Sequence, residues 1–228
     1  ALNRVIDAEI DARNPRTATR QLPQGLMNKK EILIFVAICF GIMVFAAWKL
    51  NTICLILSPI ALFLMIIYSY TKRFTWMCHL VLGVTSAAAP VGAWLAVTGK
   101  VSLIPLVMGE ANTLWVAGFD IIYGAQDYDF DTKNGIHSIP ARFGVENALK
   151  ISSVFHILAV IFLFIVGVLS PELGIIYYIG LSINIVLFII QHKMISADNL
   201  KNVKIASYSI NQVISIVFLL RGLIDCLI

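Results

Sequence analysis

The chain contains seven long apolar stretches, and these constrain its fold more than any other feature of the sequence. Their residue ranges are 31–48, 52–70, 77–98, 102–125, 148–169, 173–192 and 204–227. About 20 apolar residues are enough for an α-helix to cross the ~30 Å hydrocarbon core of a bilayer. With 59% hydrophobic and only 13% charged residues, the chain is too apolar for an ordinary soluble domain. The sequence therefore predicts an all-α, multi-pass transmembrane helix bundle with seven spans, in a single domain over residues 1–228.

The positions of lysine and arginine predict the orientation of this bundle. If the stretches cross the membrane in turn, 14 of the 17 Lys and Arg residues lie on one side, and Lys49, Lys100 and Arg221 lie on the other. The side richer in Lys and Arg is normally cytoplasmic. The longer connections, including 1–30 and 126–147, are therefore expected in the cytoplasm. This asymmetry accounts for the net charge of +4, so we expect a lipid bilayer as partner and no nucleic acid.

The stretch NRVIDAEID, residues 3–11, places polar and acidic side chains beside the first apolar stretch. Asn3, Asp7 and Asp11 recur at every fourth position, which puts them on one stripe of a helix. Glu9 falls off this stripe and is expected to be solvated. The stripe is a set of oxygen ligands at the predicted cytoplasmic surface.

A second acidic stripe follows the fourth apolar stretch, in DIIYGAQDYDFDTKNGIHS, residues 120–138. If the helix continues to about residue 131, Asp127 and Asp131 lie within about 20° of Asp120 at about 100° per residue. Asp129 then points the opposite way and is expected to be solvated. Because both stripes lie on the same predicted side of the membrane, we expect them to meet.

Carboxylates brought together in this way repel one another unless a cation neutralises them, most of all near hydrocarbon. Oxygen ligands without His or Cys suit Mg²⁺, which typically bridges one or two carboxylates to a substrate diphosphate. Arg16, Arg20 and Lys133 are expected to bind the same diphosphate, since Arg offers a bidentate fork. The pattern therefore predicts an Mg²⁺-dependent diphosphate site at the cytoplasmic face.

Several residues near the two stripes have two interpretations. Tyr68 and Tyr123 are compatible with the interfacial aromatic belt and also with a place in the site. His137 is intermediate between a solvated residue and a site residue. His79 lies at the edge of an apolar stretch without partners at ligand spacing, so a packing or interfacial role is expected.

These motifs resemble those of the UbiA superfamily of intramembrane aromatic prenyltransferases. NRVIDAEID is similar to the first signature, NxxxDxxxD, and NPRTATRQLPQG resembles the RTxxRPLPxG segment that follows it. DIIYGAQDYDFDTKNGIHS is similar to the second signature, DxxYxxxDxxxD, and YSYTKRFT resembles the short loop between the two. At the final basic position of the second signature, the chain has His137 in place of the commoner Lys.

The resemblance implies a nine-helix bundle in which the first signature ends the second helix. The chain is then expected to lack the first helix and most of the second, and to need about 50 to 65 upstream residues for activity, at ~20 residues per span. By resemblance, Asn3, Asp7, Asp127 and Asp131 hold Mg²⁺ around the prenyl diphosphate. The full expected site comprises the catalytic acids Asp7, Asp11, Asp120, Asp127 and Asp131 and the substrate-binding residues Asn3, Arg16, Arg20, Tyr68, Lys72, Tyr123, Lys133 and His137.

The implied activity is transfer of a polyprenyl group from an allylic polyprenyl diphosphate to an aromatic hydroxy acid in quinone biosynthesis. The chain looks most like the bacterial 4-hydroxybenzoate polyprenyltransferase-like branch, which includes members associated with menaquinone synthesis by the futalosine route. The acceptor is therefore expected to be 4-hydroxybenzoate or a dihydroxynaphthoate, and the location the bacterial inner membrane, with the active site facing the cytoplasm. Two alternatives remain, a non-catalytic truncated relative and a cation-coupled transporter, which would carry its acids at mid-bilayer.

Overall fold

A computed structural model describes residues 1–227 of the chain, and its named elements are all helices. They are α1 (Leu2–Ile6), α2 (Ala8–Arg13), α3 (Lys29–Leu50), α4 (Thr52–Thr71), α5 (Cys78–Thr98), α6 (Leu103–Gly124), the 3₁₀ turn η1 (Ala125–Asp127), α7 (Tyr128–Asn134), α8 (Ile139–Phe143), α9 (Val145–Leu169), α10 (Ile175–Lys193), the π-helix η2 (Ile205–Ser209) and α11 (Ile210–Leu227). This confirms the predicted all-α fold class.

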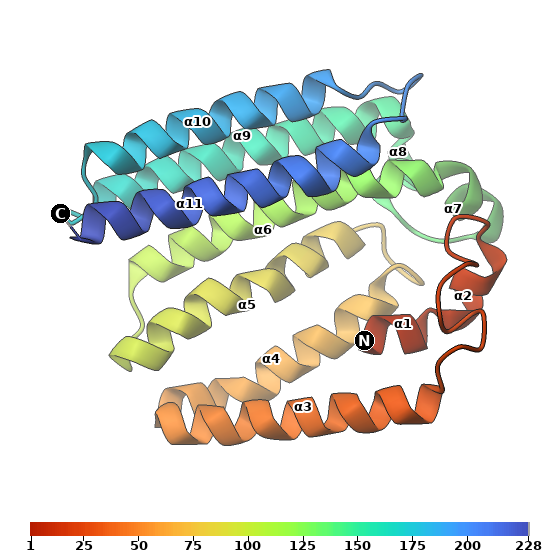
Figure 1. Ribbon diagram of the computed structural model, residues 1–228, viewed down its shortest axis with the longest axis horizontal. Helices are drawn as coiled ribbons and strands as arrows, with labels where there is room; N and C mark the ends of the chain where they lie inside the picture. Colours follow the sequence, from red (N-terminus) through yellow and green to blue (C-terminus); the bar gives the residue numbers. More distant parts are fainter. Residues whose placement is uncertain (228) are drawn as a thin grey trace.

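The long helices α3, α4, α5, α6, α9, α10 and α11 form a bundle in which successive helices run in opposite directions (Figure 1). Short turns join them at one end of the bundle, and longer segments join them at the other. The helices α2, α7 and α8 lie at the end with the longer segments, whereas α11 finishes at the opposite end. The two acidic motifs are thereby brought to the same end of the molecule.

Within the described residues 1–227, six segments are long and apolar enough to cross a membrane. They are Lys29–Leu50, Thr52–Thr71, Cys78–Thr98, Val145–Leu169, Ile175–Lys193 and Ile205–Asp225. Each coincides with one of the predicted spans. The seventh predicted span coincides with α6, whose 22 residues include the polar side chains Glu110, Asn112 and Asp120. The count of seven spans therefore stays a prediction.

Asparagine side chains cap the first two long helices. Asn28 Oδ1 accepts a hydrogen bond from the Lys30 backbone N–H at the start of α3, at 2.9 Å. Asn51 Oδ1 accepts one from the Cys54 backbone N–H at the start of α4, also at 2.9 Å. Each bond satisfies an N–H group that has no partner within the first helical turn. Asn51 Nδ2 also donates to the Leu95 carbonyl at 2.8 Å, so the turn between α3 and α4 is tied to α5.

The helix α6 lies at the centre of the bundle, packed between α5 and α9. Its contact with α5 requires a glycine at position 83, because a Cβ atom on Gly83 would come within 2.2 Å of the Thr113 carbonyl oxygen. Near the end of α6, Ile122 is fully buried in a cluster with Val203. The part of α6 that carries Asp120 is therefore held firmly by its neighbours.

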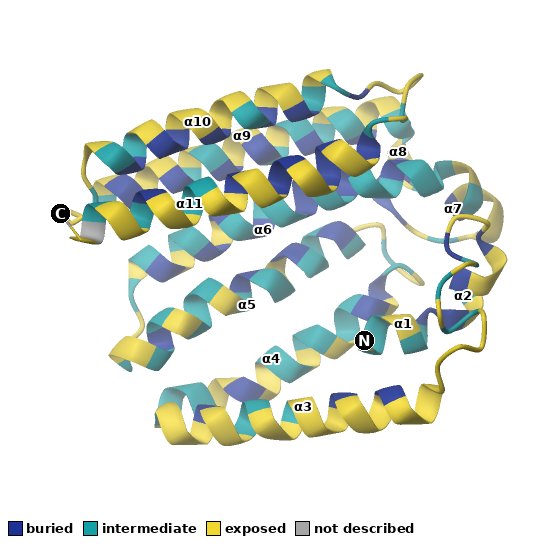
Figure 2. Ribbon diagram, viewed as in Figure 1, coloured by how far each residue is buried: buried dark blue, intermediate teal, exposed yellow. Residues whose placement is uncertain are grey.

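The outward faces of the helices are strongly apolar. On α3, Leu33, Ile34, Phe35, Ile38 and Trp48 are all exposed, and Figure 2 shows most of this helix as exposed surface. Soluble monomers rarely expose apolar patches larger than a few hundred Å². A face of this kind is suited to the hydrocarbon of a membrane.

Two helices predicted to be continuous are interrupted. The N-terminal helix breaks at Asp7 (φ −91°, ψ 3°), which separates α1 from α2. The helix predicted to run from Asp120 to about residue 131 is also broken, because the 3₁₀ turn Ala125–Asp127 follows α6. The predicted continuous helix from Asp120 to about residue 131 is therefore wrong, since Asp120, Asp127 and Asp131 lie on α6, η1 and α7 respectively.

Candidate active site

A cavity of about 320 Å³ opens at the end of the bundle that carries the charged segments. Its walls come from α1, α2 and the loop after them, from the end of α4 and the start of α5, and from α6, η1, α7 and the segment that leads into α8. Eleven of the thirteen predicted site residues line it: Asn3, Asp7, Asp11, Arg16, Arg20, Tyr68, Lys72, Asp120, Tyr123, Asp127 and Asp131. The two acidic motifs therefore meet as predicted, although the helices that carry them are broken.

Asp7 is the most buried of these acids, at 2% exposure. Its Oδ2 atom accepts a hydrogen bond from Asn3 Nδ2 at 2.8 Å and lies 2.7 Å from Lys72 Nζ. Its Oδ1 atom is buried without a hydrogen bond and lies 3.7 Å from Arg73 Nη2. The Asp7 carboxylate thus has one oxygen bonded within the protein and one that is free to accept a ligand.

Asp127 is bound by the loop that follows α2. Arg16 contacts both of its oxygens through Nε and Nη2, with Nε 2.8 Å from Oδ1, and Asn14 Nδ2 donates to Oδ1 at 2.8 Å. Arg16 Nη1 donates to the Tyr123 hydroxyl at 2.6 Å. Although burial lowers the pKa of Arg16, its bonds to Asp127 raise that pKa overall. Arg16 therefore remains fully charged and links the two acidic motifs.

Asp131 lies on α7 and is buried at 8% exposure. The Ser138 hydroxyl donates to its Oδ2 atom at 2.9 Å, and the same hydroxyl accepts from the Ala141 backbone N–H to cap α8. Burial raises the pKa of Asp131 to about 6, although the Ser138 hydrogen bond opposes this rise. The carboxylate is therefore poorly neutralised by its protein surroundings.

Three of these acids already have a cationic partner within the protein, so an added cation is not the only group that can neutralise them. Lys72, Arg16 and Arg20 each form an ion pair with one acid of the site. Within residues 1–227, no three His, Cys, Asp or Glu side chains converge closely enough to hold a metal ion. The residues present still fit Mg²⁺ in chemical type, because the acids offer only oxygen and one buried oxygen of Asp7 has no hydrogen bond.

Two predicted substrate-binding residues, Lys133 and His137, do not line the cavity, and both are exposed. His137 contributes only backbone contacts, since its N–H donates to the Lys72 carbonyl at 2.8 Å. Asp129 is exposed, as its position off the stripe predicted. The structure gives Lys133 and His137 no contact in the cavity that would support their predicted role.

Three lining residues that bond to the acids of the site were not predicted: Asn14, His79 and Ser138. His79 was interpreted as a packing residue, yet its Nδ1 atom lies 2.7 Å from Asp120 Oδ2. The two residues are 41 positions apart in the sequence, so no local spacing indicated the contact. Ser138 carries a local signal, because Ser followed by Ile-Pro is a favourable helix start.

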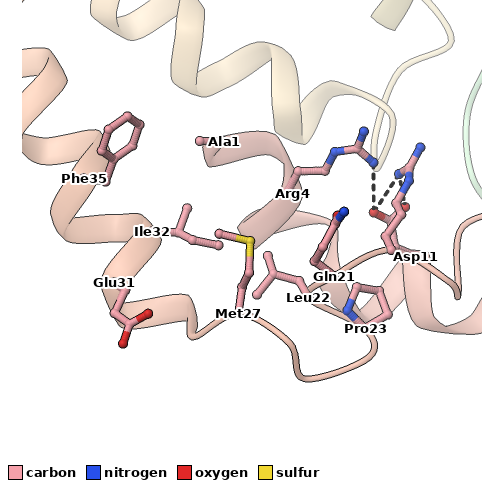
Figure 3. Close-up of a pocket in the computed structure, with 11 residues that line it drawn as sticks. Ala1, Arg4, Asp11, Gln21, Leu22, Pro23, Met27, Glu31, Ile32 and Phe35 are labelled. Atoms are coloured by element: carbon pink, nitrogen blue, oxygen red, sulfur yellow. Dashed lines mark hydrogen bonds and ion pairs between the residues drawn. The ribbon is translucent and has the colours of Figure 1, made fainter.

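A second cavity, of about 440 Å³, adjoins the first (Figure 3). Its lining residues are mostly apolar, and they are Ala1, Arg4, Asp11, Arg20, Gln21, Leu22, Pro23, Met27, Glu31, Ile32 and Phe35. Asp11 and Arg20 line both cavities. Arg20 Nη1 lies 2.7 Å from Asp11 Oδ2, and Arg4 lies 3.8 Å from the same oxygen. This ion pair therefore forms part of the wall between an apolar space and a polar one.

A bundle with such a site is compatible with more than one class of membrane protein, and comparison with known families separates them. Residues 1–214 match the UbiA prenyltransferase family. The chain belongs to this family. The resemblance recognised in the two acidic motifs is thereby confirmed, and the cavity that these motifs line is the one in which to seek UbiA chemistry.

Curated UbiA relatives cover most of the chain. A 4-hydroxybenzoate octaprenyltransferase from Providencia stuartii is 33% identical over 194 residues, which are 85% of this chain and 66% of the relative. One from Tolumonas auensis is 31% identical, over 85% of this chain and 67% of the relative. The chain thus spans about two thirds of the length of these relatives.

Two solved UbiA structures share the fold. A UbiA homolog from Aeropyrum pernix K1, solved in its apo form, is 34% identical and has a TM-score of 0.88, covering 98% of this chain and 82% of that chain. A homolog from Archaeoglobus fulgidus, bound to GPP and Mg²⁺, is 20% identical with a TM-score of 0.69, over 100% of this chain and 82% of that chain. At that identity, the second likeness supports the fold alone.

Proposed function

We propose that this UbiA protein transfers a polyprenyl group from an allylic polyprenyl diphosphate to an aromatic hydroxy acid in quinone biosynthesis. The observation that carries the proposal is one cavity lined by five acids and by Lys72, Arg16 and Arg20, at the end of a bundle whose outer faces are apolar. A polyprenyl diphosphate has an ionic head and a lipid tail, so it needs both environments. The names of the curated relatives support the same reaction class.

The cations of the cavity are proposed to bind the diphosphate. Lys72 and Arg16 already face the cavity through ion pairs with Asp7 and Asp127. Binding of a diphosphate together with a divalent cation preserves this charge balance, because the protein cations gain phosphate oxygens while the carboxylates gain the metal. Arg16 is suited to this exchange, since its planar fork binds carboxylate and phosphate in the same bidentate geometry.

Asn3, Asp7, Asp127 and Asp131 are proposed to hold Mg²⁺, through oxygen atoms alone. When bound, the ion supplies positive charge that stabilises the leaving diphosphate. Mg²⁺ accompanies GPP in the Archaeoglobus homolog. Asn3 contributes in a second way, because its Nδ2 atom donates to Asp7 Oδ2 and so orients that carboxylate.

The remainder of the cavity has to protect a reactive carbon. Cleavage of the bond between the allylic carbon and the diphosphate oxygen leaves positive charge on that carbon, and water would capture it. Ile10, Leu82 and Phe130 line the cavity among the charged groups, and they provide apolar surface beside that carbon. The acceptor ring, of 4-hydroxybenzoate or dihydroxynaphthoate type, then forms the new carbon–carbon bond.

The protein is further proposed to lie in the bacterial inner membrane with this cavity facing the cytoplasm. The support is the distribution of Lys and Arg, which gather at the cavity end of the bundle. This orientation opens the cavity to water-soluble aromatic acids and Mg²⁺, while the polyprenyl tail remains in lipid.

The test is a transfer assay with the full-length protein in lipid bilayers. Labelled geranyl diphosphate, Mg²⁺ and either 4-hydroxybenzoate or a dihydroxynaphthoate are supplied, and diphosphate release and prenylated product are both measured. We expect equal amounts of the two products, and Asp129→Asn serves as the matched control. Cation flux without diphosphate release would instead support the transporter alternative, and neither product nor flux would support a non-catalytic relative.

A further inference from the structure

Asp120 differs from the other acids of the cavity in having a histidine as its partner. His79 Nδ1 lies 2.7 Å from Asp120 Oδ2, whereas Asp7, Asp11 and Asp127 contact Lys or Arg. The side chain of His79 is 5% exposed and that of Asp120 is 27% exposed. Asp120 therefore presents its carboxylate to the cavity with a buried imidazole behind it.

The imidazole is fixed in this orientation by its surroundings. A Cβ atom at position 124 would come within 3.0 Å of His79 Cε1, so Gly124 leaves the space in which the ring sits. His79 Nε2 is buried and has no hydrogen-bond partner in the part of the chain that the structure describes. The hydrogen bond between His79 Nδ1 and Asp120 Oδ2 thus orients the carboxylate.

Asp120 also lies further from the charged end of the bundle than Asp127 and Asp131, two of the acids proposed to hold the metal. It lies on α6 itself, whereas Asp127 and Asp131 lie on η1 and α7 beyond the end of that helix. Asp127 follows Asp120 by seven positions, which is ~10 Å along a helix. A diphosphate bound by Arg16 and Lys72 at the outer part of the cavity places its allylic carbon further in, on the side of Asp120.

The walls at this depth suit an aromatic ring. Leu82 lies one turn after His79 on α5, and Tyr123 lies one turn after Asp120 on α6, so each shares a helix face with a member of the pair. Both residues line the cavity. A ring held between them has an apolar and an aromatic neighbour, with the Asp120 carboxylate at its edge.

We propose that Asp120 is the general base of the aromatic substitution and that His79 is a positioning residue that orients its carboxylate. This inference rests on the proposed prenyl transfer. Formation of the carbon–carbon bond leaves one ring carbon with both the prenyl group and its original hydrogen, while the diphosphate departs with the electron pair of the broken carbon–oxygen bond. An Asp120 oxygen takes the proton, and the electron pair of the carbon–hydrogen bond returns to the ring and restores its aromaticity. The proton then leaves Asp120 for water at the cavity mouth.

The proposal is tested with acceptor deuterated at the ring carbon that becomes prenylated. Full-length wild type, Asp120→Asn, His79→Asn and His79→Leu are compared in bilayers with Mg²⁺ and geranyl diphosphate, and Asp129→Asn is the control. We expect wild type to transfer the prenyl group to labelled and unlabelled acceptor at equal rates, since bond formation precedes proton loss. Asp120→Asn slows transfer by about 10²-fold or more, as loss of a general base does, and now shows a primary isotope effect. Its equilibrium binding of geranyl diphosphate stays at the wild-type value.

The two His79 variants distinguish a role of His79 in orienting the Asp120 carboxylate from a purely structural role. The Asn amide can still donate a hydrogen bond to Asp120, so His79→Asn is expected to retain more transfer than His79→Leu and to show a smaller isotope effect. Absence of an isotope effect in Asp120→Asn, or loss of geranyl diphosphate binding in that variant, overturns the base assignment, because the leaving diphosphate then takes the proton or Asp120 serves the metal. Equal impairment of the two His79 variants overturns the positioning role. If wild type prenylates no aromatic acceptor, the proposed function itself fails and the base assignment fails with it.

Discussion

Arg20 binds both carboxylate oxygens of Asp11 through a single nitrogen, with Nη1 at 2.8 Å from Oδ1 and 2.7 Å from Oδ2. The side chain of Asp11 is 7% exposed and that of Arg20 is 25% exposed. The pair lines both the polar cavity and the apolar one. It therefore contributes to the charge of the site and also to the wall between the two cavities. Arg20 has further N–H groups that can bind a diphosphate without leaving Asp11.

Replacing Arg20 therefore has two separable effects. Arg20→Ala leaves the Asp11 carboxylate with Arg4, at 3.8 Å, as its remaining cation, and we expect a loss of about 1–3 kcal/mol in the free energy of unfolding. We also expect geranyl diphosphate to bind about 10-fold more weakly or worse, as the loss of a charged hydrogen bond implies. Arg20→Lys restores the single-nitrogen contact but not the fork. It should therefore recover stability more fully than diphosphate binding. An effect of Arg20→Ala confined to the KM of the aromatic acceptor would contradict the diphosphate role.

Asp127 and Asp129 provide a matched pair of substitutions two residues apart. Asp127 lines the cavity and binds Arg16, whereas Asp129 is exposed. Asp127→Asn is expected to reduce turnover by at least ~10²-fold, or about 2.7 kcal/mol in the barrier, while Asp129→Asn has little effect. Turnover is measured as prenylated product per protein inserted in the bilayer. Equal losses of turnover in the two variants would show that lining the cavity does not determine whether an Asp residue contributes to catalysis.

Asp7→Asn is expected to abolish turnover while the protein remains folded in the membrane. The substitution keeps the shape of the side chain but removes the charge that Lys72 balances at 2.7 Å and one proposed Mg²⁺ ligand. Turnover and Mg²⁺ binding are measured on the same preparation, with circular dichroism as the control for helix content. Retention of wild-type Mg²⁺ affinity in Asp7→Asn would rule out this residue as a ligand.

Removal of divalent cations is expected to stop turnover without unfolding the protein. Asp7, Asp127 and Asp11 are paired with Lys72, Arg16 and Arg20 respectively, so we expect the fold not to depend on a metal to neutralise them. In EDTA we therefore expect no prenylated product, an unchanged helical circular dichroism spectrum, and full recovery on addition of Mg²⁺. A large loss of helix content in EDTA would mean that these ion pairs alone do not keep the protein folded without a metal.

The raised pKa of Asp131 leads us to expect a specific pH dependence of the protein's stability in EDTA. Burial raises its pKa to about 6, from an ordinary value of 3.8, so the folded protein holds the proton at a higher pH than the unfolded chain. The stabilising contribution of this protonated acid is complete below about pH 4 and is lost as the pH rises through about 6. Asp131→Asn should therefore gain melting temperature relative to wild type between about pH 4 and pH 7. A difference between the two proteins that is independent of pH would contradict the raised pKa.

The sequence identified the Asp, Lys and Arg residues that line the cavity because its spacings are local. Asn3, Asp7 and Asp11 face the cavity despite the break at Asp7, since short helices on either side preserve the approximate period of the stripe. Asp120, Asp127 and Asp131 reach the cavity from three different elements, α6, η1 and α7. The predicted straight helix did not include the 3₁₀ turn that separates α6 from α7. Lys133, predicted to bind the diphosphate, is exposed outside the cavity. Its charge and its position near the acidic motif in the sequence did not indicate on which side of α7 its side chain lies.

The sequence alone was sufficient to establish the membrane-spanning helical class, the end of the bundle at which the charged segments gather and the acids that line the site. These properties follow from apolar length, the count of Lys and Arg and helical periodicity, each of which acts within a single segment. Only the tertiary structure decided which basic side chain faces which acid, as Lys72 faces Asp7 and His79 faces Asp120. Such pairs join residues far apart in the chain, and they are set by how α4, α5 and α6 pack, through close approaches such as that of Gly83 to Thr113. Packing of this kind depends on the complementary shapes of several helices at once, so the spacing within one segment does not contain it.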